Sequence, residues 1–238
     1  GDLWFGLSWG GEVVRYQPAD AGGEEQWTLF DTTHGMQPGD RPRLAQTHDG
    51  TIWAVSNHSQ GGVNRFNGSQ WSHFWLSDFG GSDINTSVLQ TQDGAVWIGG
   101  HSGSLQVLRD GTWQRHGPAD LPLSQSRIAD LLQTPDGALW IAGLGQEATR
   151  LDYGTTRWTT WEGLQYQCET PDGSAWFVAS DGAVVRHRSQ AEWLRYDVSD
   201  GMMDAPSGLL VTGDGDLWAA GSQQGTAATA QFFGGHWQ

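Results

Sequence analysis

Thr134-Pro135-Asp136-Gly137-Ala138-Leu139-Trp140-Ile141-Ala142-Gly143 is the stretch of sequence that decides the fold. An Asp-Gly pair between apolar runs predicts a β-hairpin, because the tight turn needs positive φ angles at its centre. The pattern of Asp-Gly, one further residue, an apolar residue and Trp recurs at residues 49–53, 93–97, 172–176 and 214–218, and the chain begins inside another copy. Six copies in 238 residues predict a repeat architecture.

Each copy continues in the same way, with a second apolar run, a turn and a second Trp, and a Thr stands two residues before the Asp. The unit is therefore four short strands, named a to d from the inside outward. Four antiparallel strands at a spacing of roughly 40 residues predict the blade of a β-propeller, in which Trp rings fill the wedge between blades. We expect an all-β fold, a single β-propeller domain over residues 1–238 with six blades. Only five copies have an a strand, so the ring would have seven blades if residues are missing at the ends.

The composition excludes several functions. A net charge of −15 argues against nucleic acid as a partner and against binding to an anionic membrane surface. All 12 basic residues counted as Lys or Arg are Arg, so the chain has no Lys to form a Schiff base or to complete a P-loop. The single Cys168 allows no internal disulfide, and no apolar run is long enough for membrane insertion. No motif predicts a metal site, a cofactor or a catalytic set, and each Asp-Gly turn offers only one carboxylate, too few for calcium.

Parts of the repeat resemble the two-component regulator propeller repeat. The matching residues are Trp193-Leu194-Arg195-Tyr196 followed by Asp200-Gly201 and Asp214-Gly215-Asp216-Leu217-Trp218, and the run from Trp71 through Ile98-Gly99 fits as well. The resemblance covers nearly the whole chain. It implies a bacterial sensor-type β-propeller that binds a ligand without catalysis and lies outside the cytoplasm, periplasmic or secreted. The absence of an initiator Met and of a signal peptide predicts a processed or excised segment.

The candidate ligand-binding residues lie in loops. In a propeller the b–c turns and d–a loops share one face, so the ligand, a small molecule or a carbohydrate, is expected there around the axial mouth. Trp9 and Trp75 lie outside both Trp series and either stack on a ligand or cover their own blades. His58 and His101 occupy equivalent turns and are either a pair near the axis or solvated turn residues. The remaining b–c turn candidates are Gln146 and Asp181.

Two alternative functions stay open. Streptogramin B lyases are propellers with similar strand, Gly and Trp repeats, and this resemblance implies a His and Glu site with Mg²⁺, for which His101 and Glu147 are the nearest matches here. The other alternative is an excised or engineered propeller without retained activity. Exposed rings without a His and carboxylate dyad would favour a binding module over the lyase.

Several structural expectations follow from the repeat. The leading Trps, of which Trp97 is one, should be buried between blades, and the Arg residues of the c strands should pair with acidic neighbours or lie on Trp rings. The connection between Trp161 and Gly173 is short, which predicts a notch beside Glu162, Gln165 and Asp181. The first and last blades should meet through Trp4, or an open strand edge should support self-association.

Overall fold

The computed structural model of the chain describes residues 1–8, 10–19, 23–56, 62–75, 84–117, 120–121, 127–144, 147–152, 154–155, 157–189 and 192–238. It divides into two compact units, Gly1–Leu131 and Leu132–Gln238, and the boundary falls within the strand Ile128–Gln133. Each unit is described by itself. The expectation of a single domain over residues 1–238 stays a prediction.

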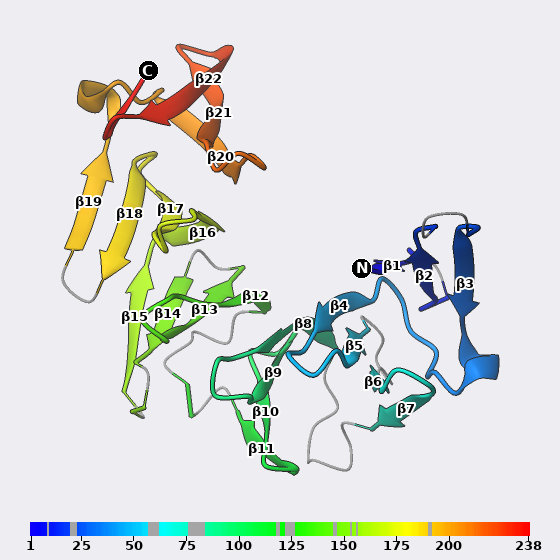
Figure 1. The fold of residues 1–238 in the computed structure, drawn as a ribbon. Coiled ribbons are helices and arrows are strands. Elements are labelled where there is room, and N and C mark those ends of the chain that lie inside the picture. Colours follow the sequence, from blue (N-terminus) through cyan, green and yellow to red (C-terminus); the bar gives the residue numbers. More distant parts are fainter. Residues whose placement is uncertain are drawn as a thin grey trace. The chain divides into compact units, whose positions relative to one another are not determined.

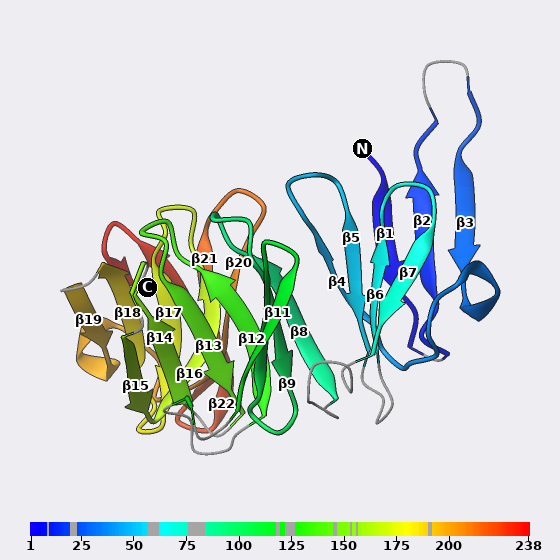
Figure 2. The same cartoon turned by 90° about the horizontal axis from the view of Figure 1, so that it is seen from below.

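The first unit contains three antiparallel sheets whose strands follow chain order (Figure 1). The first sheet has three strands and the other two have four, and Figure 2 shows β4 to β7 lying side by side. Their bounds are β1 (Leu3–Gly6), β2 (Val13–Gln17), β3 (Gln26–Phe30), β4 (Arg43–Gln46), β5 (Ile52–Val55), β6 (Val63–Phe66), β7 (Trp71–Phe74), β8 (Asn85–Gln90), β9 (Val96–Gly100), β10 (Leu105–Arg109) and β11 (Thr112–His116). The first sheet thus has no a strand, as the sequence predicts.

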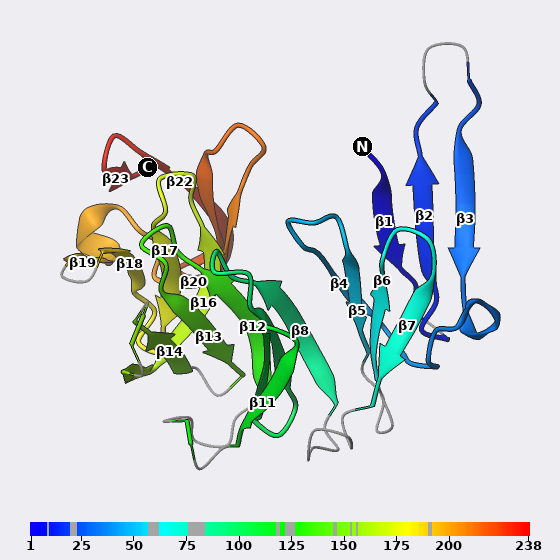
Figure 3. The same cartoon turned by 60° about the horizontal axis from the view of Figure 1, so that its bottom comes forward.

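Three four-stranded antiparallel sheets follow, again in chain order, and they lie in the second unit except for residues 128–131, which belong to the first; Figure 3 shows β20 and β22 in the last of these sheets. Their bounds are β12 (Ile128–Gln133), β13 (Leu139–Gly143), β14 (Glu147–Leu151), β15 (Trp158–Glu162), β16 (Leu164–Glu169), β17 (Ala175–Ala179), β18 (Val184–Ser189), β19 (Glu192–Tyr196), β20 (Ala205–Val211), β21 (Leu217–Gln223), β22 (Thr226–Phe233) and β23 (His236–Trp237). Two 3-10 helices, η1 (Thr32–His34) and η3 (Val198–Asp200), lie in the connections after β3 and β19. Six sheets of this kind match the predicted six-bladed β-propeller, so the fold class is confirmed.

The Asp-Gly turns fold through their own side chains. In the turn between β12 and β13, the Thr134 hydroxyl donates to Asp136 Oδ1 at 2.6 Å and the Ala138 amide donates to the same oxygen at 3.2 Å. Gly137 follows with a φ of +84°, a left-handed angle that favours glycine. The same Thr to Asp bond recurs at 2.5–2.6 Å in the turns that contain Asp49, Asp93 and Asp172. A local sequence motif therefore determines each hairpin.

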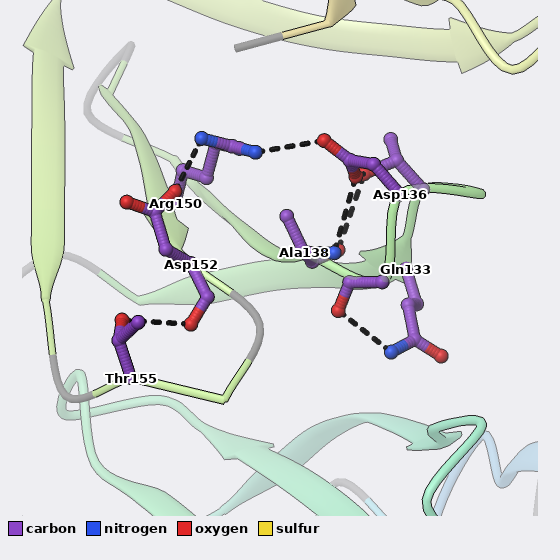
Figure 4. A network of polar contacts seen from close by, with 8 residues as sticks. Gln133, Asp136, Ala138, Arg150, Asp152 and Thr155 are labelled. Carbon is purple, nitrogen blue, oxygen red and sulfur yellow. Dashed lines mark hydrogen bonds and ion pairs between the residues drawn. The ribbon is translucent and has the colours of Figure 1, made fainter.

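The c-strand arginines tie each turn to its sheet. Arg150 on β14 donates to Asp136 at 2.8 Å and also pairs with Asp152 (Figure 4). Its guanidinium lies 6.0 Å from the Trp140 ring. Arg186 repeats the arrangement with Asp172 at 2.5 Å and Trp176 at 5.4 Å. Arg15 and Arg65 likewise lie 5.5 Å and 5.6 Å from Trp4 and Trp53. The predicted pairing of these arginines with carboxylates or Trp rings is confirmed.

The leading Trps form the core. Trp53, Trp97, Trp140 and Trp176 are 1–6% exposed, as predicted, whereas Trp4 and Trp218 are only half-buried. Trp4 contacts the second sheet, with ring centroids 5.3 Å from Phe66 and 6.3 Å from Trp71. Trp4 thus packs against the sheet that follows its own, and the expected contact of the first and last blades stays a prediction.

The short connection after Trp161 is confirmed. β15 passes directly into β16 through one residue, Gly163, with a φ of +76° (Figure 1). Its carbonyl accepts a 2.8 Å bond from the Ser180 amide in the b–c turn of the next sheet. Glu162, Gln165 and Asp181 are all exposed beside it. The connection after β19, by contrast, spans residues 197–204 and contains η3.

Two further expectations concern Cys168 and the strand edges. Cys168 on β16 is a free, partly buried thiol that packs against the last sheet's core, and burial raises its pKa to about 11. β1 is an edge strand of the three-stranded sheet, with Leu3 52% and Phe5 42% exposed. Self-association through such an edge stays a prediction.

Candidate functional site

The structure describes three of the six candidate residues that the sequence singles out, namely Trp75, His101 and Asp181. Trp9, His58 and Gln146 lie outside the described residues. Trp75 is half-buried after β7, where its ring meets His73 edge-on at 5.6 Å, so it covers its own sheet. His101 is exposed in the turn after β9, and its backbone amide donates to the Ile84 carbonyl at 2.8 Å. Within the described residues, no hydrogen bond or ring contact joins Trp75 to His101.

Asp181 in the second unit serves its own sheet. It accepts bonds from Arg195 at 2.6 Å and from the Ala183 amide at 3.3 Å. These hydrogen bonds lower the pKa of the Asp181 carboxyl, and the bond from Arg195 has the largest effect. Across the described part of the chain, no group of three or more His, Cys, Asp or Glu side chains could hold a metal ion, and no helix is long and apolar enough to cross a membrane.

The structure instead forms a cleft of about 380 Å³ in the first unit. Its walls come from four places in the sequence that the strand order brings together, where β1 ends and where β4, β8 and β12 begin. The lining residues are Gly6, Leu7, Ser8, Arg41, Pro42, Arg43, Asn85, Thr86 and Arg127. In terms of the repeat, these are a b–c turn and the starts of three a strands, which is the face where the sequence predicts the ligand.

The loop between β3 and β4 is held in place on both sides before it reaches the cleft. The Gln37 amide donates to Asn64 Oδ1 on β6 at 2.7 Å. Gly39 passes so close to Ser56 that a Cβ at this position would overlap the Ser56 side chain. Arg41 then adopts a φ of +47°, a conformation that an L-residue rarely adopts and that surrounding structure must impose. The loop therefore presents Arg41 and Arg43 to the cleft from a fixed backbone.

The cleft is positively charged and short of internal partners. Arg41 has a single exposed ion pair, with Asp40 at 3.8 Å, and among the described residues no carboxylate lies within 4.0 Å of Arg43 or Arg127. The lining includes no Asp or Glu. The c-strand arginines differ, because the fold itself neutralises Arg150 with two carboxylates. In a chain of net charge −15, these three arginines, of which only Arg41 has a described carboxylate within 4.0 Å, are suited to hold an oxyanion.

Asn85 supplies the second feature of the cleft. The residue is 1% exposed, and neither its amide nitrogen nor its amide oxygen has a hydrogen-bond partner among the described residues. Its neighbour Thr86 is already used, since its hydroxyl contacts the carbonyls of Gly99 at 3.1 Å and of Ile128. A buried amide without partners costs roughly 1–3 kcal/mol for each unsatisfied group. The wall of the cleft thus holds one donor and one acceptor that no described residue satisfies.

Sequence reasoning missed Arg41, Arg43, Asn85 and Arg127. Its candidates lie in the b–c turns and d–a loops, whereas these four residues lie at or just before the starts of β4, β8 and β12. A signal was available, because Arg41 and Arg43 immediately precede Leu44, and Arg127 immediately precedes Ile128. An Arg at the first residues of an inner strand lies at the mouth of the propeller axis.

The comparisons with known proteins support the fold alone. Neither the known protein families nor the curated proteins give a match to this sequence. Among solved structures, the chain is similar to a streptogramin B lyase, with a TM-score of 0.67 and 17% identity over 98% of this chain and 80% of that chain. It is also similar to an inactive virginiamycin B lyase from Staphylococcus aureus with quinupristin, with a TM-score of 0.63 and 14% identity over 98% and 88% of the two chains.

A third similar structure is the extracellular domain of the one-component system BT4673 from B. thetaiotaomicron. The TM-score is 0.63 and the identity 15%, over 92% of this chain and 30% of that chain. The neighbours thus include both an enzyme and an extracellular domain of a signalling protein, and at these identities they establish the β-propeller class only.

Proposed function

We propose that this chain is a non-enzymatic ligand-binding module of the sensor type, and that its ligand binds in the first-unit cleft. The observation that carries the proposal is the buried Asn85 amide, which has no partner among the described residues and lines the cleft. A fold that leaves such a group unsatisfied is less stable than it could be, and a bound ligand would supply the missing bonds. The cleft volume of about 380 Å³ suits a small molecule or a monosaccharide.

Two further observations support the sensor interpretation and an extracytoplasmic location. The repeat resembles the two-component regulator propellers, and the similar structures include the extracellular domain of BT4673. The cleft lies where a b–c turn meets the a strands, on the expected face.

The test is a thermal-shift screen of metabolites and carbohydrates with three proteins. Ser8 is exposed at the edge of the cleft, so Ser8→Trp blocks the cleft whatever the chemistry of the ligand. Ser72→Trp places the same side chain on exposed strand β7, outside the cleft, and is the matched control. We expect a compound that stabilises the wild type and the control but not Ser8→Trp. Stabilisation that survives Ser8→Trp would place the ligand elsewhere, and turnover of a stabilising compound would favour the lyase-type alternative.

A further inference from the structure

The first-unit cleft contains two kinds of polar side chain, and each kind binds a different type of ligand group. Arg41, Arg43 and Arg127 offer only donors and positive charge, and among the described residues the one carboxylate within 4.0 Å of them is that of Asp40, at 3.8 Å from Arg41. The Asn85 amide offers a donor and an acceptor together, both buried and without partners among the described residues. A neutral sugar would leave the arginines unpaired, whereas a bare inorganic anion, which only accepts, would leave the Asn85 oxygen unsatisfied.

A ligand hydroxyl group can hydrogen-bond to both the nitrogen and the oxygen of the Asn85 amide, because a hydroxyl both donates and accepts. Two or more oxyanion groups of the ligand would pair with the arginines, because each guanidinium presents a planar fork of donors that matches a carboxylate. We infer that the cleft selects a small organic polyanion that carries a hydroxyl group, of which a hydroxy-polycarboxylate is the simplest form. This inference rests on the proposed function, since it names the chemical class of the ligand for the same cleft.

The position of the arginines supports a selective site over diffuse attraction. The Arg41 backbone is fixed by the anchored loop, and Arg43 begins β4 while Arg127 immediately precedes β12. The three side chains therefore approach the cleft from two different strand starts. A surface patch on a flexible segment would attract anions without selecting among them, whereas arginines on fixed backbone hold oxyanion groups at set positions.

The test uses isothermal titration calorimetry with citrate and tricarballylate on the full chain at low salt. The two probes have three carboxylates each, and only citrate carries a hydroxyl. We expect citrate to bind and tricarballylate to bind at least about fivefold more weakly, because it leaves the buried amide unsatisfied. Citrate affinity should fall as salt is raised, because ions screen the exposed guanidiniums.

Variants separate the two kinds of group. The double variant Arg43→Gln with Arg127→Gln should lower the affinity for citrate by at least about tenfold for each charge removed. The exposed Arg115 on β11 lies outside the cleft, so Arg115→Gln removes one positive charge elsewhere and should leave citrate binding intact. Asn85→Leu should abolish the preference for citrate over tricarballylate. Its folding is not at risk, because it removes a buried polar group without partners among the described residues, and circular dichroism checks this.

The outcomes distinguish the inference from the proposed function. Failure of citrate to bind at about 10 mM overturns the inference, as does binding that the double Arg variant retains. A neutral compound from the thermal-shift screen that loses its effect in Ser8→Trp would preserve the binding function and overturn the polyanion class. Equal binding of inorganic sulfate, which only accepts hydrogen bonds, and citrate would overturn the requirement for a hydroxyl. Citrate binding that depends on both the arginines and Asn85 supports the inference.

Discussion

His187 on β18 should make the stability of the protein depend on pH. The residue is 3% exposed, and its ring lies 5.0 Å from Trp140 and 4.4 Å from Trp193. Burial, together with the charge of Arg150, lowers its pKa from 6.5 to about 4, although the Asp136 carboxylate acts in the opposite direction. The folded protein therefore holds His187 neutral where an unfolded chain would bind a proton.

The magnitude follows from linkage. A base whose pKa is lowered on folding binds fewer protons in the folded state, so stability is full above pH 6.5 and falls as the pH drops toward 4. With these two values, the loss between about pH 7.5 and pH 5 is about 2 kcal/mol of unfolding free energy. Other groups also titrate in this range, so the test compares two proteins that share them.

The perturbation is His187→Phe. His187 lies opposite Trp193 in the strand register, and Phe66 and Phe232 lie in the same way opposite Trp71 and Trp237. A Phe ring therefore fits the repeat at this position without a protonatable group. Between pH 7.5 and pH 5 the variant should lose about 2 kcal/mol less stability than the wild type.

The assay is urea unfolding followed by tryptophan fluorescence at both pH values. The control is His48→Gln, which removes an exposed histidine side chain in the first unit. Equal losses in wild type and His187→Phe would refute the reasoning, since they would mean that His187 titrates in the folded state as it does in the unfolded chain.

Three further predictions concern the packing and the turns. Trp97→Ala should lower the unfolding free energy by about 3–5 kcal/mol in urea unfolding, because the ring is 6% exposed, and a loss below about 1 kcal/mol would contradict its place in the core. Gly163→Ala should lower the melting temperature more than Gly154→Ala, because both have positive φ but only at Gly163 would the Cβ meet a neighbour, and equal effects would oppose this account. Burial of Asp172 opposes its ionisation, but hydrogen bonds and the charge of Arg186 outweigh this and lower its pKa to about 2. The ionised Asp172 therefore stabilises the folded protein above about pH 3.8, and this contribution disappears as the pH falls toward 2. Asp172→Asn should therefore flatten acid unfolding in that range, which fluorescence against pH would measure, and an unchanged curve would contradict the pairing.

The sequence by itself determined the hairpins and the sheets. Each Asp-Gly turn is completed by a Thr two residues earlier and by the amide two residues later, as at Asp136, so the signal is local. The alternation that follows each turn buries the leading Trp, and Trp140 is 1% exposed for that reason. The one-residue connection at Gly163 was also readable, because a count of residues between two fixed motifs limits the length of a loop.

Only the tertiary structure decided which polar groups are left for a ligand. Arg150 and Arg43 are the same residue type, and the sequence does not say that Arg150 meets two carboxylates while none of the described ones lies within 4.0 Å of Arg43. Asn85 reads as an ordinary polar residue at a strand start, yet stacking of the sheets buries it to 1% exposure and leaves its amide without a described partner. Turn chemistry acts over a few residues, whereas the cleft joins residues up to about 120 positions apart, and their proximity arises from the packing of whole sheets.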